Sequence, residues 1–225
     1  MGESIERSSF INLVKSIISK VVVLEAVLPG TVIGIKTSSG VVLAGEKRMT
    51  YDGFILSKSV RKLFPITEHT AVGFAGLTGD MNFLYRVLKT EARNYELEHG
   101  REIKTRSLAK LLSIILYSYK LFPMLTEAVV GGFDEAPSLF VLDAVGSLLE
   151  ERYTALGSGS QLALSIIEQS YREDMPLEEA KNLAIKAVLA AIERDVLSGD
   201  GVDVLVITRE GIKSEEHLLA RSTTR

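Results

Sequence analysis

The amino-acid sequence predicts an α+β fold of four layers, α-β-β-α, in which helices cover the outer faces of two packed β-sheets. Strand-like and helix-like stretches come in blocks: strands, two helices, strands, two helices and strands. This order differs from the strict alternation of a parallel α/β sheet. Both helix pairs are strongly apolar, and hydrophobic residues make up 46% of the 225 residues, enough for a large core in one domain.

The first strands follow a proline-glycine pair. Apolar runs at Thr31–Thr37 and Val41–Arg48 are separated by a Ser-Ser-Gly tripeptide, which suits a short hairpin turn. The stretch Thr70–Leu77 predicts another strand. Small residues alternate along it, as expected where a backbone approaches another element closely.

The rest of the chain supplies two helix pairs and the remaining strands. The predicted helices span Asp80–Glu98, Thr105–Leu121, Gln161–Tyr171 and Pro176–Val196. The predicted strands read TEAVVGGF (126–133), SLFVLDA (138–144), SLLEERYTAL (147–156) and VDVLVITREGI (202–212), with turns at Asp134–Pro137 and Val145-Gly146.

The first 30 residues predict a pro-segment or assembly extension ahead of a single domain at residues 31–225. Apolar residues from Phe10 to Val21 follow helical spacing after Ser8-Ser9, which suits a helix N-cap. Two lysines and a glutamate interrupt this run, so it falls short of the ~20 residues that a membrane-spanning helix needs. No signal-peptide cleavage site follows it. We therefore expect an amphipathic helix that packs on a partner, in a cytoplasmic protein with no membrane contact.

Composition narrows the possible functions. The net charge of -3 gives no reason to expect a nucleic-acid partner. The absence of cysteine excludes disulfides, thiolate metal sites and cysteine nucleophiles. The three histidines, His69, His99 and His217, are too scattered to predict a metal centre, so we expect no metal and no organic cofactor.

Four stretches carry side chains suited to chemistry, and each also has a structural interpretation. Thr31 follows a glycine that permits a tight turn, yet a threonine that opens a strand is usually only a good β-former. The charged stretch Glu46–Arg48, with Lys58, Arg61 and Lys62, follows a strand, where charges usually form a solvated turn. The Gly-Ser turn GSGS at Gly157–Ser160 often starts a helix. The stretch ERDVLSGDG at Glu193–Gly201 contains a Ser-Gly pair, which often ends a helix.

In combination, these stretches resemble the β-type subunits of the 20S proteasome, and the archaeal members most closely. The resemblance covers the chain from Gly30 to about Thr208. It rests on the motifs TVIGIK, GVVLAGEKRMTYDGFILSKSVRKLF, HTAVGFAGLTGD, VVGGFD, LGSGS and ERDVLSGDGVDVLVIT, which match in order. It implies the α-β-β-α fold of N-terminal nucleophile hydrolases and assembly into stacked seven-membered rings.

The resemblance also implies a set of site residues. The family's lysine matches Lys62, its acidic residue matches Glu46, and the glycine whose N–H stabilises the oxyanion matches Gly76. The nucleophile would be Thr31, freed by cleavage of the Gly30-Thr31 bond, with its own α-amine as the base. The supporting Ser-Asp-Ser set matches Ser158, Asp195 and Ser198, and the positions that shape the substrate pocket match Met49, Val60 and Phe74.

One spacing departs from the family pattern. In catalytic members the nucleophilic threonine lies sixteen residues before the acidic residue and thirty-two before the lysine. Counted back from Glu46 and from Lys62, both spacings arrive at Gly30, so Thr31 falls one place late. Because side chains alternate faces along a strand, this step would turn the hydroxyl away from the lysine. A bulge at the start of the strand could restore its position.

Three functional interpretations therefore stand. The chain is a threonine-type endopeptidase that acts on unfolded polypeptide through Thr31, or it is a non-catalytic β subunit that completes the ring, or it is a simpler hydrolase of the same class that needs no α ring. In the first two, the expected partners are α-type proteasome subunits and other β subunits in stacked heptameric rings, with a regulatory ATPase that delivers substrate.

Overall fold

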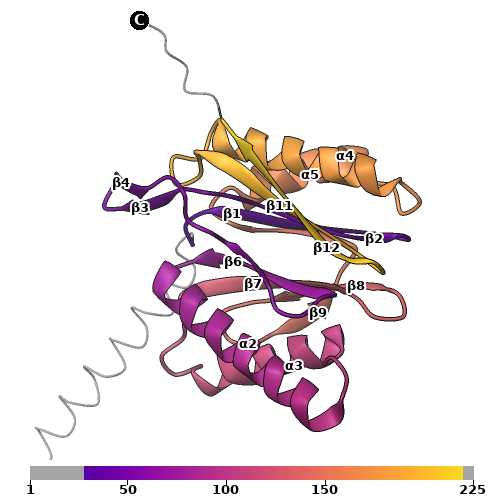
Figure 1. Ribbon diagram of the computed structural model, residues 1–225. Coiled ribbons are helices and arrows are strands. Elements are labelled where there is room, and N and C mark those ends of the chain that lie inside the picture. The colour runs from indigo at the N-terminus through magenta and orange to yellow at the C-terminus, as the bar shows by residue number, and fades with distance from the viewer. Residues whose placement is uncertain (1–27, 220–225) are drawn as a thin grey trace, which may run out of the picture.

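The computed structural model describes residues 28–219, which form two five-stranded antiparallel sheets packed face to face (Figure 1). The first sheet has the order β10-β1-β2-β11-β12 and the second has the order β5-β6-β7-β8-β9. The strands of the first sheet are β1 (Thr31–Thr37), β2 (Gly40–Glu46), β10 (Tyr153–Gly157), β11 (Gly201–Thr208) and β12 (Gly211–Leu218). Those of the second are β5 (Leu63–Pro65), β6 (Thr70–Gly76), β7 (Thr126–Phe133), β8 (Pro137–Leu142) and β9 (Leu148–Glu150).

Two helix pairs cover the outer faces of the sheets, which completes the four layers (Figure 1). Helices α2 (Thr78–His99) and α3 (Thr105–Ser118) pack on the second sheet, and α4 (Ser160–Ser170) and α5 (Leu177–Ile192) pack on the first. The short hairpin β3 (Met49–Tyr51) and β4 (Phe54–Ser57) extends from the edge of this sandwich. The predicted α+β, α-β-β-α architecture is confirmed.

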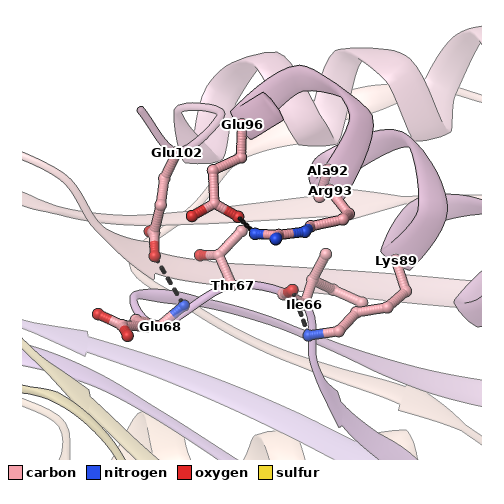
Figure 2. Close-up of a pocket in the computed structure, with 8 residues that line it drawn as sticks. All are labelled: Ile66, Thr67, Glu68, Lys89, Ala92, Arg93, Glu96 and Glu102. Atoms are coloured by element: carbon pink, nitrogen blue, oxygen red, sulfur yellow. Dashed lines mark hydrogen bonds and ion pairs between the residues drawn. The ribbon is translucent and has the colours of Figure 1, made fainter. Parts of the chain in front are cut away.

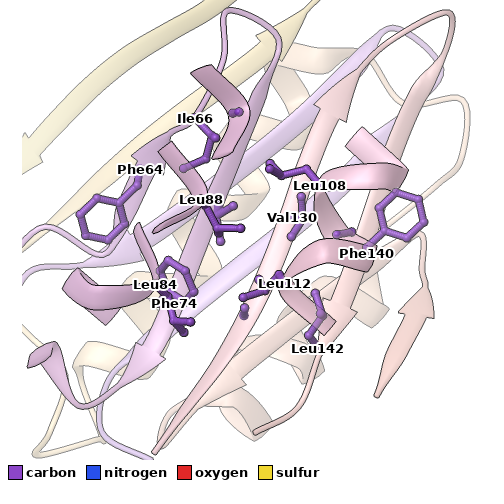
Figure 3. Close-up of a cluster of buried hydrophobic side chains, with 14 of the residues drawn as sticks. Phe64, Ile66, Phe74, Leu84, Leu88, Leu108, Leu112, Val130, Phe140 and Leu142 are labelled. Atoms are coloured by element: carbon purple, nitrogen blue, oxygen red, sulfur yellow. The ribbon is translucent and has the colours of Figure 1, made fainter. Parts of the chain in front are cut away.

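Hydrophobic side chains fill the space between each pair of layers. Phe74 of the second sheet lies beside Leu84 of α2, and Phe140 belongs to the same buried cluster (Figure 3). Strand β1 shows how the two faces of a sheet are used, because its side chains alternate. Ile33 and Ile35 face α4 and α5, whereas Val32 lies in the cluster between the sheets.

The sheets approach each other closely where β1 crosses β6. A Cβ atom at Gly73 would lie 2.7 Å from Cγ1 of Val32, closer than real Cβ contacts. The alternating small residues of β6 therefore allow close packing of the sheets, as the sequence predicts. Within residues 28–219, no helix is long and apolar enough to cross a membrane.

The structure also differs from the sequence-based prediction in several elements. The single strand expected at 147–156 is two strands in different sheets, because the chain crosses between sheets after Glu150. Strand β12 and the hairpin β3-β4 were not expected, since their exposed, polar residues lack a clear apolar pattern. The predicted helix at Pro176–Val196 ends at Ile192, and its last residues form a loop. The helix predicted before residue 28 lies outside the described residues.

Candidate active site

The polar residues singled out by the sequence come together at the start of β1. Six chain segments meet there, although they are distant in the sequence. They contribute Gly30 and Thr31 at the start of β1, Glu46 at the end of β2, Lys62 before β5, Gly76 at the end of β6, Ser158 between β10 and α4, and Asp195 and Ser198 between α5 and β11.

Lys62 and Glu46 form a buried ion pair at the centre of this site. Their side chains are 4% and 0% exposed, and the lysine ammonium donates to Oε1 of Glu46. The other carboxylate oxygen accepts the backbone N–H groups of Arg48 at 2.6 Å and Gly199 at 2.9 Å. Since buried charges are tolerated only when they are paired and hydrogen-bonded, these donors fix the carboxylate and, through it, the lysine.

Asp195 organises the two serines. Its Oδ2 atom accepts the hydroxyl of Ser158 at 2.5 Å and the hydroxyl of Ser198 at 2.6 Å. A serine hydroxyl has one proton to donate, so these bonds leave both oxygens as acceptors. Ser158 Oγ accepts the backbone N–H of Gly30 at 3.0 Å, which holds the start of β1 in the site.

The Thr31 hydroxyl lies on the serine side of the site. Its Oγ1 is 2.7 Å from Oγ of Ser198. Because Ser198 donates its own proton to Asp195, the proton in this bond comes from Thr31. Thr31 is completely buried and lies on the face of β1 that also carries Ile33, toward α4 and α5. The hydroxyl makes no hydrogen bond to Lys62 among the described residues.

Gly30, by contrast, faces the ion pair. A Cβ atom at Gly30 would lie 2.2 Å from Nζ of Lys62 and 2.8 Å from Oε1 of Glu46. Gly30 has a φ of +102°, a conformation that residues with a side chain rarely adopt. A side chain at position 30 would therefore point at the lysine. This agrees with the two sequence spacings that lead back to Gly30.

The backbone hydrogen bond of Gly76 likewise indicates that Gly30, and not Thr31, lies at the position expected for the nucleophile. Its N–H donates a 3.0 Å hydrogen bond to the carbonyl oxygen of Pro29. If Gly76 is the oxyanion donor that the family resemblance implies, the carbonyl that occupies its site belongs to the Pro29-Gly30 bond. The Gly30-Thr31 bond lies one residue further along the chain.

The three residues expected in a substrate pocket lie in different surroundings. Phe74 is fully buried, and its ring centroid is 5.9 Å from that of Phe64 within the helix-covered core. Phe74 can therefore influence the shape of a substrate pocket only from within the core. Met49 and Val60 are partly exposed, and the Val60 N–H bonds to the carbonyl of Lys47 at 2.9 Å. Their role in a pocket stays a prediction.

Arg48 belongs to the charged stretch Glu46–Arg48, and its supporting contacts are not predicted by the sequence. Its Nε atom donates to Asp200 at 2.8 Å, and its Nη1 atom donates to the carbonyl of Val196 at 3.1 Å. These bonds tie the end of β2 to the loop that carries Asp195 and Ser198. No local sequence pattern signals a contact between side chains 152 positions apart.

Glu127 on β7 is a residue without a predicted role. Its Oε2 atom accepts the N–H of Gly157 at 3.0 Å, beside the strand end that contacts Gly30. Burial raises the pKa of its carboxyl group; the hydrogen bond from Gly157 lowers this pKa less, and the charge of Asp143 raises it further. Folding therefore favours the protonated form of Glu127.

The sign of the resulting pH dependence follows from linkage. A carboxyl group whose pKa is raised by folding binds more protons in the folded state, so its contribution to stability is fully present below its unfolded pKa and is lost as the pH rises through its folded pKa. Glu127→Gln stays neutral and can keep the acceptor for Gly157. We expect this variant to unfold at a higher temperature than the parent at pH 8, with a smaller difference near pH 4.

Thermal unfolding at the two pH values measures this difference. Glu91→Gln, an exposed position on α2, is the matched control and should show no such pH-dependent gain. An equal effect of the two substitutions at pH 8 would contradict the assignment.

Comparison with known proteins agrees with this arrangement. The family model described as proteasome subunit matches residues 27–207. "Proteasome subunit beta 1" of Desulfurococcus amylolyticus is 66% identical over 193 residues, which cover 85% of this chain and 96% of the relative. "Proteasome subunit beta 1" of Staphylothermus marinus is 61% identical, with 88% and 93% covered. "Proteasome subunit beta 2" of Thermofilum pendens is 50% identical, with 86% and 96% covered. The chain therefore belongs to the proteasome subunit family, as a β subunit of the archaeal 20S type.

Proposed function

We propose that this β subunit takes part in the hydrolysis of unfolded polypeptides in the 20S core particle by building the proteolytic chamber, without supplying a nucleophile in its intact form. The observation that carries the proposal is the position of Gly30 against Lys62. The residue that faces the buried lysine has no hydroxyl, and the hydroxyl of the next residue, Thr31, donates its proton toward Asp195 through Ser198.

Assembly with other proteasome subunits follows from the family. We propose that the partners are α subunits and other β subunits in stacked heptameric rings, in the cytoplasm, with a regulatory ATPase supplying substrate. Residues 31–225 form the proteasome domain in this proposal. Residues 1–30 remain attached as an assembly extension in the non-catalytic form, and they are a removable pro-segment in the catalytic form.

The catalytic form is a second candidate, and the surroundings of Thr31 favour it. The Thr31 nitrogen lies 3.3 Å from Oε1 of Glu46, within the same site as Lys62. Cleavage of the Gly30-Thr31 bond would free that nitrogen as an amine. The amine could then take the hydroxyl proton while Oγ1 attacks a substrate carbonyl and Gly76 stabilises the oxyanion. The departing amine takes the proton, and water hydrolyses the ester that remains on Thr31.

The mass of the purified, assembled subunit distinguishes the two candidates. We expect the chain to retain the residues before Gly30. A subunit that begins at Thr31 would contradict the non-catalytic form and support the catalytic one.

Activity gives a second measurement. In particles that carry only this type of β subunit, we expect Thr31→Ala to leave the rate of peptide hydrolysis at the parent's background level. Thr37→Ala, another buried threonine of β1 that lies outside the site, controls for effects on packing. A large loss of hydrolysis in Thr31→Ala but not in Thr37→Ala would identify Thr31 as the nucleophile.

A further inference from the structure

A cluster of metal-ligating side chains lies away from the candidate active site. Glu68 and His69 belong to the turn between β5 and β6, and Glu102 belongs to the link between α2 and α3. The cluster precedes the first residue of β6, whereas Gly76 is the last. At the usual rise per residue of a strand, the two sites are separated by about 20 Å. The three residues therefore serve neither the ion pair nor the serine-aspartate set.

The hydrogen bonds of His69 determine which ring nitrogen carries a proton. Its Nε2 atom is 3.2 Å from the carbonyl oxygen of Arg209. A carbonyl oxygen only accepts, so Nε2 carries the hydrogen, and Nδ1 of the neutral ring presents a lone pair. Nδ1 in turn lies 3.3 Å from Oε2 of Glu102. A proton on Nδ1 or a cation bound to both atoms would satisfy this contact between the ring nitrogen and the carboxylate oxygen.

Glu68 adds a second carboxylate to this point. The ligand atoms of Glu68, His69 and Glu102 all lie within 4.8 Å of one another. The Glu68 N–H donates to Oε1 of Glu102 at 3.0 Å and holds that carboxylate in place, as Figure 2 shows. Among the described residues, the Glu68 carboxylate has no hydrogen bond or ion pair of its own. It is therefore available as a ligand.

The neighbouring charged groups have other partners or line the same pocket. Arg93 pairs with Glu96 at 2.7 Å, and Lys89 donates to the carbonyl of Ile66 at 2.7 Å (Figure 2). Asp134 accepts the N–H of Thr105 at the start of α3, and Arg101 and Arg209 line the same pocket of about 500 Å³. The pocket is open to solvent, and His69 and Glu102 are about one-third exposed, so water can complete a coordination shell.

We propose that Glu68, His69 and Glu102 bind one divalent transition-metal ion, with Zn²⁺ as the best match. One imidazole nitrogen and two carboxylate oxygens are ligands that zinc accepts at about 2.0–2.2 Å, with the remaining position filled by water. The bond from Nε2 to the Arg209 carbonyl is the second contact that metal-bound histidines usually make through their other nitrogen.

Such an ion would join parts of the fold that are distant in the sequence. It would connect the β5-β6 turn to the α2-α3 link. Through His69 and Arg209 it would also reach the β11-β12 turn of the other sheet. Because an ion that binds only the folded state stabilises that state, we expect bound Zn²⁺ to raise the unfolding temperature.

The test uses the full chain in its assembled form, stripped of metal with a chelator and then titrated with ZnCl₂. We expect one Zn²⁺ per chain and a rise in unfolding temperature. His69→Ala and Glu102→Gln should weaken binding by at least about tenfold, since each removes a ligand. His99→Ala is the matched control, because this histidine lies at the end of α2 and stacks on Tyr95 at 4.1 Å, outside the cluster. It should bind Zn²⁺ as the parent does.

Cobalt gives a spectroscopic measurement that depends on metal binding, so a purely structural role of His69 would not affect it. Co²⁺ bound to these ligands should produce visible absorption bands in the parent and in His99→Ala, and none in His69→Ala. Equal binding by the parent and His69→Ala would overturn the proposal, as would no binding by the parent. In the latter case a proton fills the gap, and His69 and Glu102 form an ion pair.

Discussion

Replacing Glu46 with alanine is expected to lower the free energy of unfolding by about 3–5 kcal/mol, the usual cost of removing one partner of a buried ion pair. Lys62 is 4% exposed, and Glu46 is the only acceptor of its ammonium group among the described residues. The substitution leaves a buried positive charge unpaired. It also leaves the N–H groups of Arg48 and Gly199 without their acceptor.

Replacing the other partner of the ion pair, Lys62, should lower the free energy of unfolding by less. In Lys62→Met the carboxylate loses its counter-ion but keeps three backbone donors, those of Thr31, Arg48 and Gly199. Lys58→Met is the matched control, because Lys58 is 60% exposed and lies 3.7 Å from Asp200; exposed pairs contribute at most about 1 kcal/mol. Urea denaturation measures all three variants. A Glu46→Ala variant as stable as Lys58→Met would contradict this description of the site.

Phe74→Ala is expected to lower the free energy of unfolding by about 3–5 kcal/mol, as for other large aromatic side chains removed from a core. Phe74 has no exposed surface and packs between β6 and the helices α2 and α3 (Figure 3). The cavity left behind is lined by Phe64 and Leu84, which are held by their own neighbours.

Phe54→Ala provides the comparison, because Phe54 is 69% exposed on the β3-β4 hairpin. Removing it should change stability by no more than about 0.5 kcal/mol. Denaturation of both variants under the same conditions gives the difference. If Phe74→Ala proved as mild as Phe54→Ala, Phe74 would belong to an adaptable pocket wall rather than to the core.

The fold could be predicted because its strands and helices carry clear apolar patterns. Strand β1 alternates between two buried faces, and β7 matches the predicted stretch from Thr126 to Phe133. Strand β12 could not be predicted in this way. It lies at the edge of its sheet with most side chains exposed. Its sequence GIKSEEHL therefore lacks the alternating apolar residues that a buried face would require.

The candidate site was predictable in a different way. No physical pattern links Thr31 to Ser198, which are 167 positions apart, and only the ordered motifs of a known family placed them together. Counting along those motifs led to Gly30, and the structure places Gly30 against Lys62. Contacts outside the motifs, such as that of Glu127 with Gly157, depend on how the two sheets pack and have no local signal.

The serine-aspartate set has a consequence for how such sequences are interpreted. Asp195 closes the loop after α5 by accepting the Leu197 N–H and both serine hydroxyls, and Ser158 anchors the start of β1. These bonds hold three segments together whether or not a peptide is ever cut. Natural selection on folding alone could therefore preserve the residues that mark a protease. If this subunit is non-catalytic as proposed, Ser158, Asp195 and Ser198 would be retained for folding, and the residue that faces Lys62 would be the better indicator of activity.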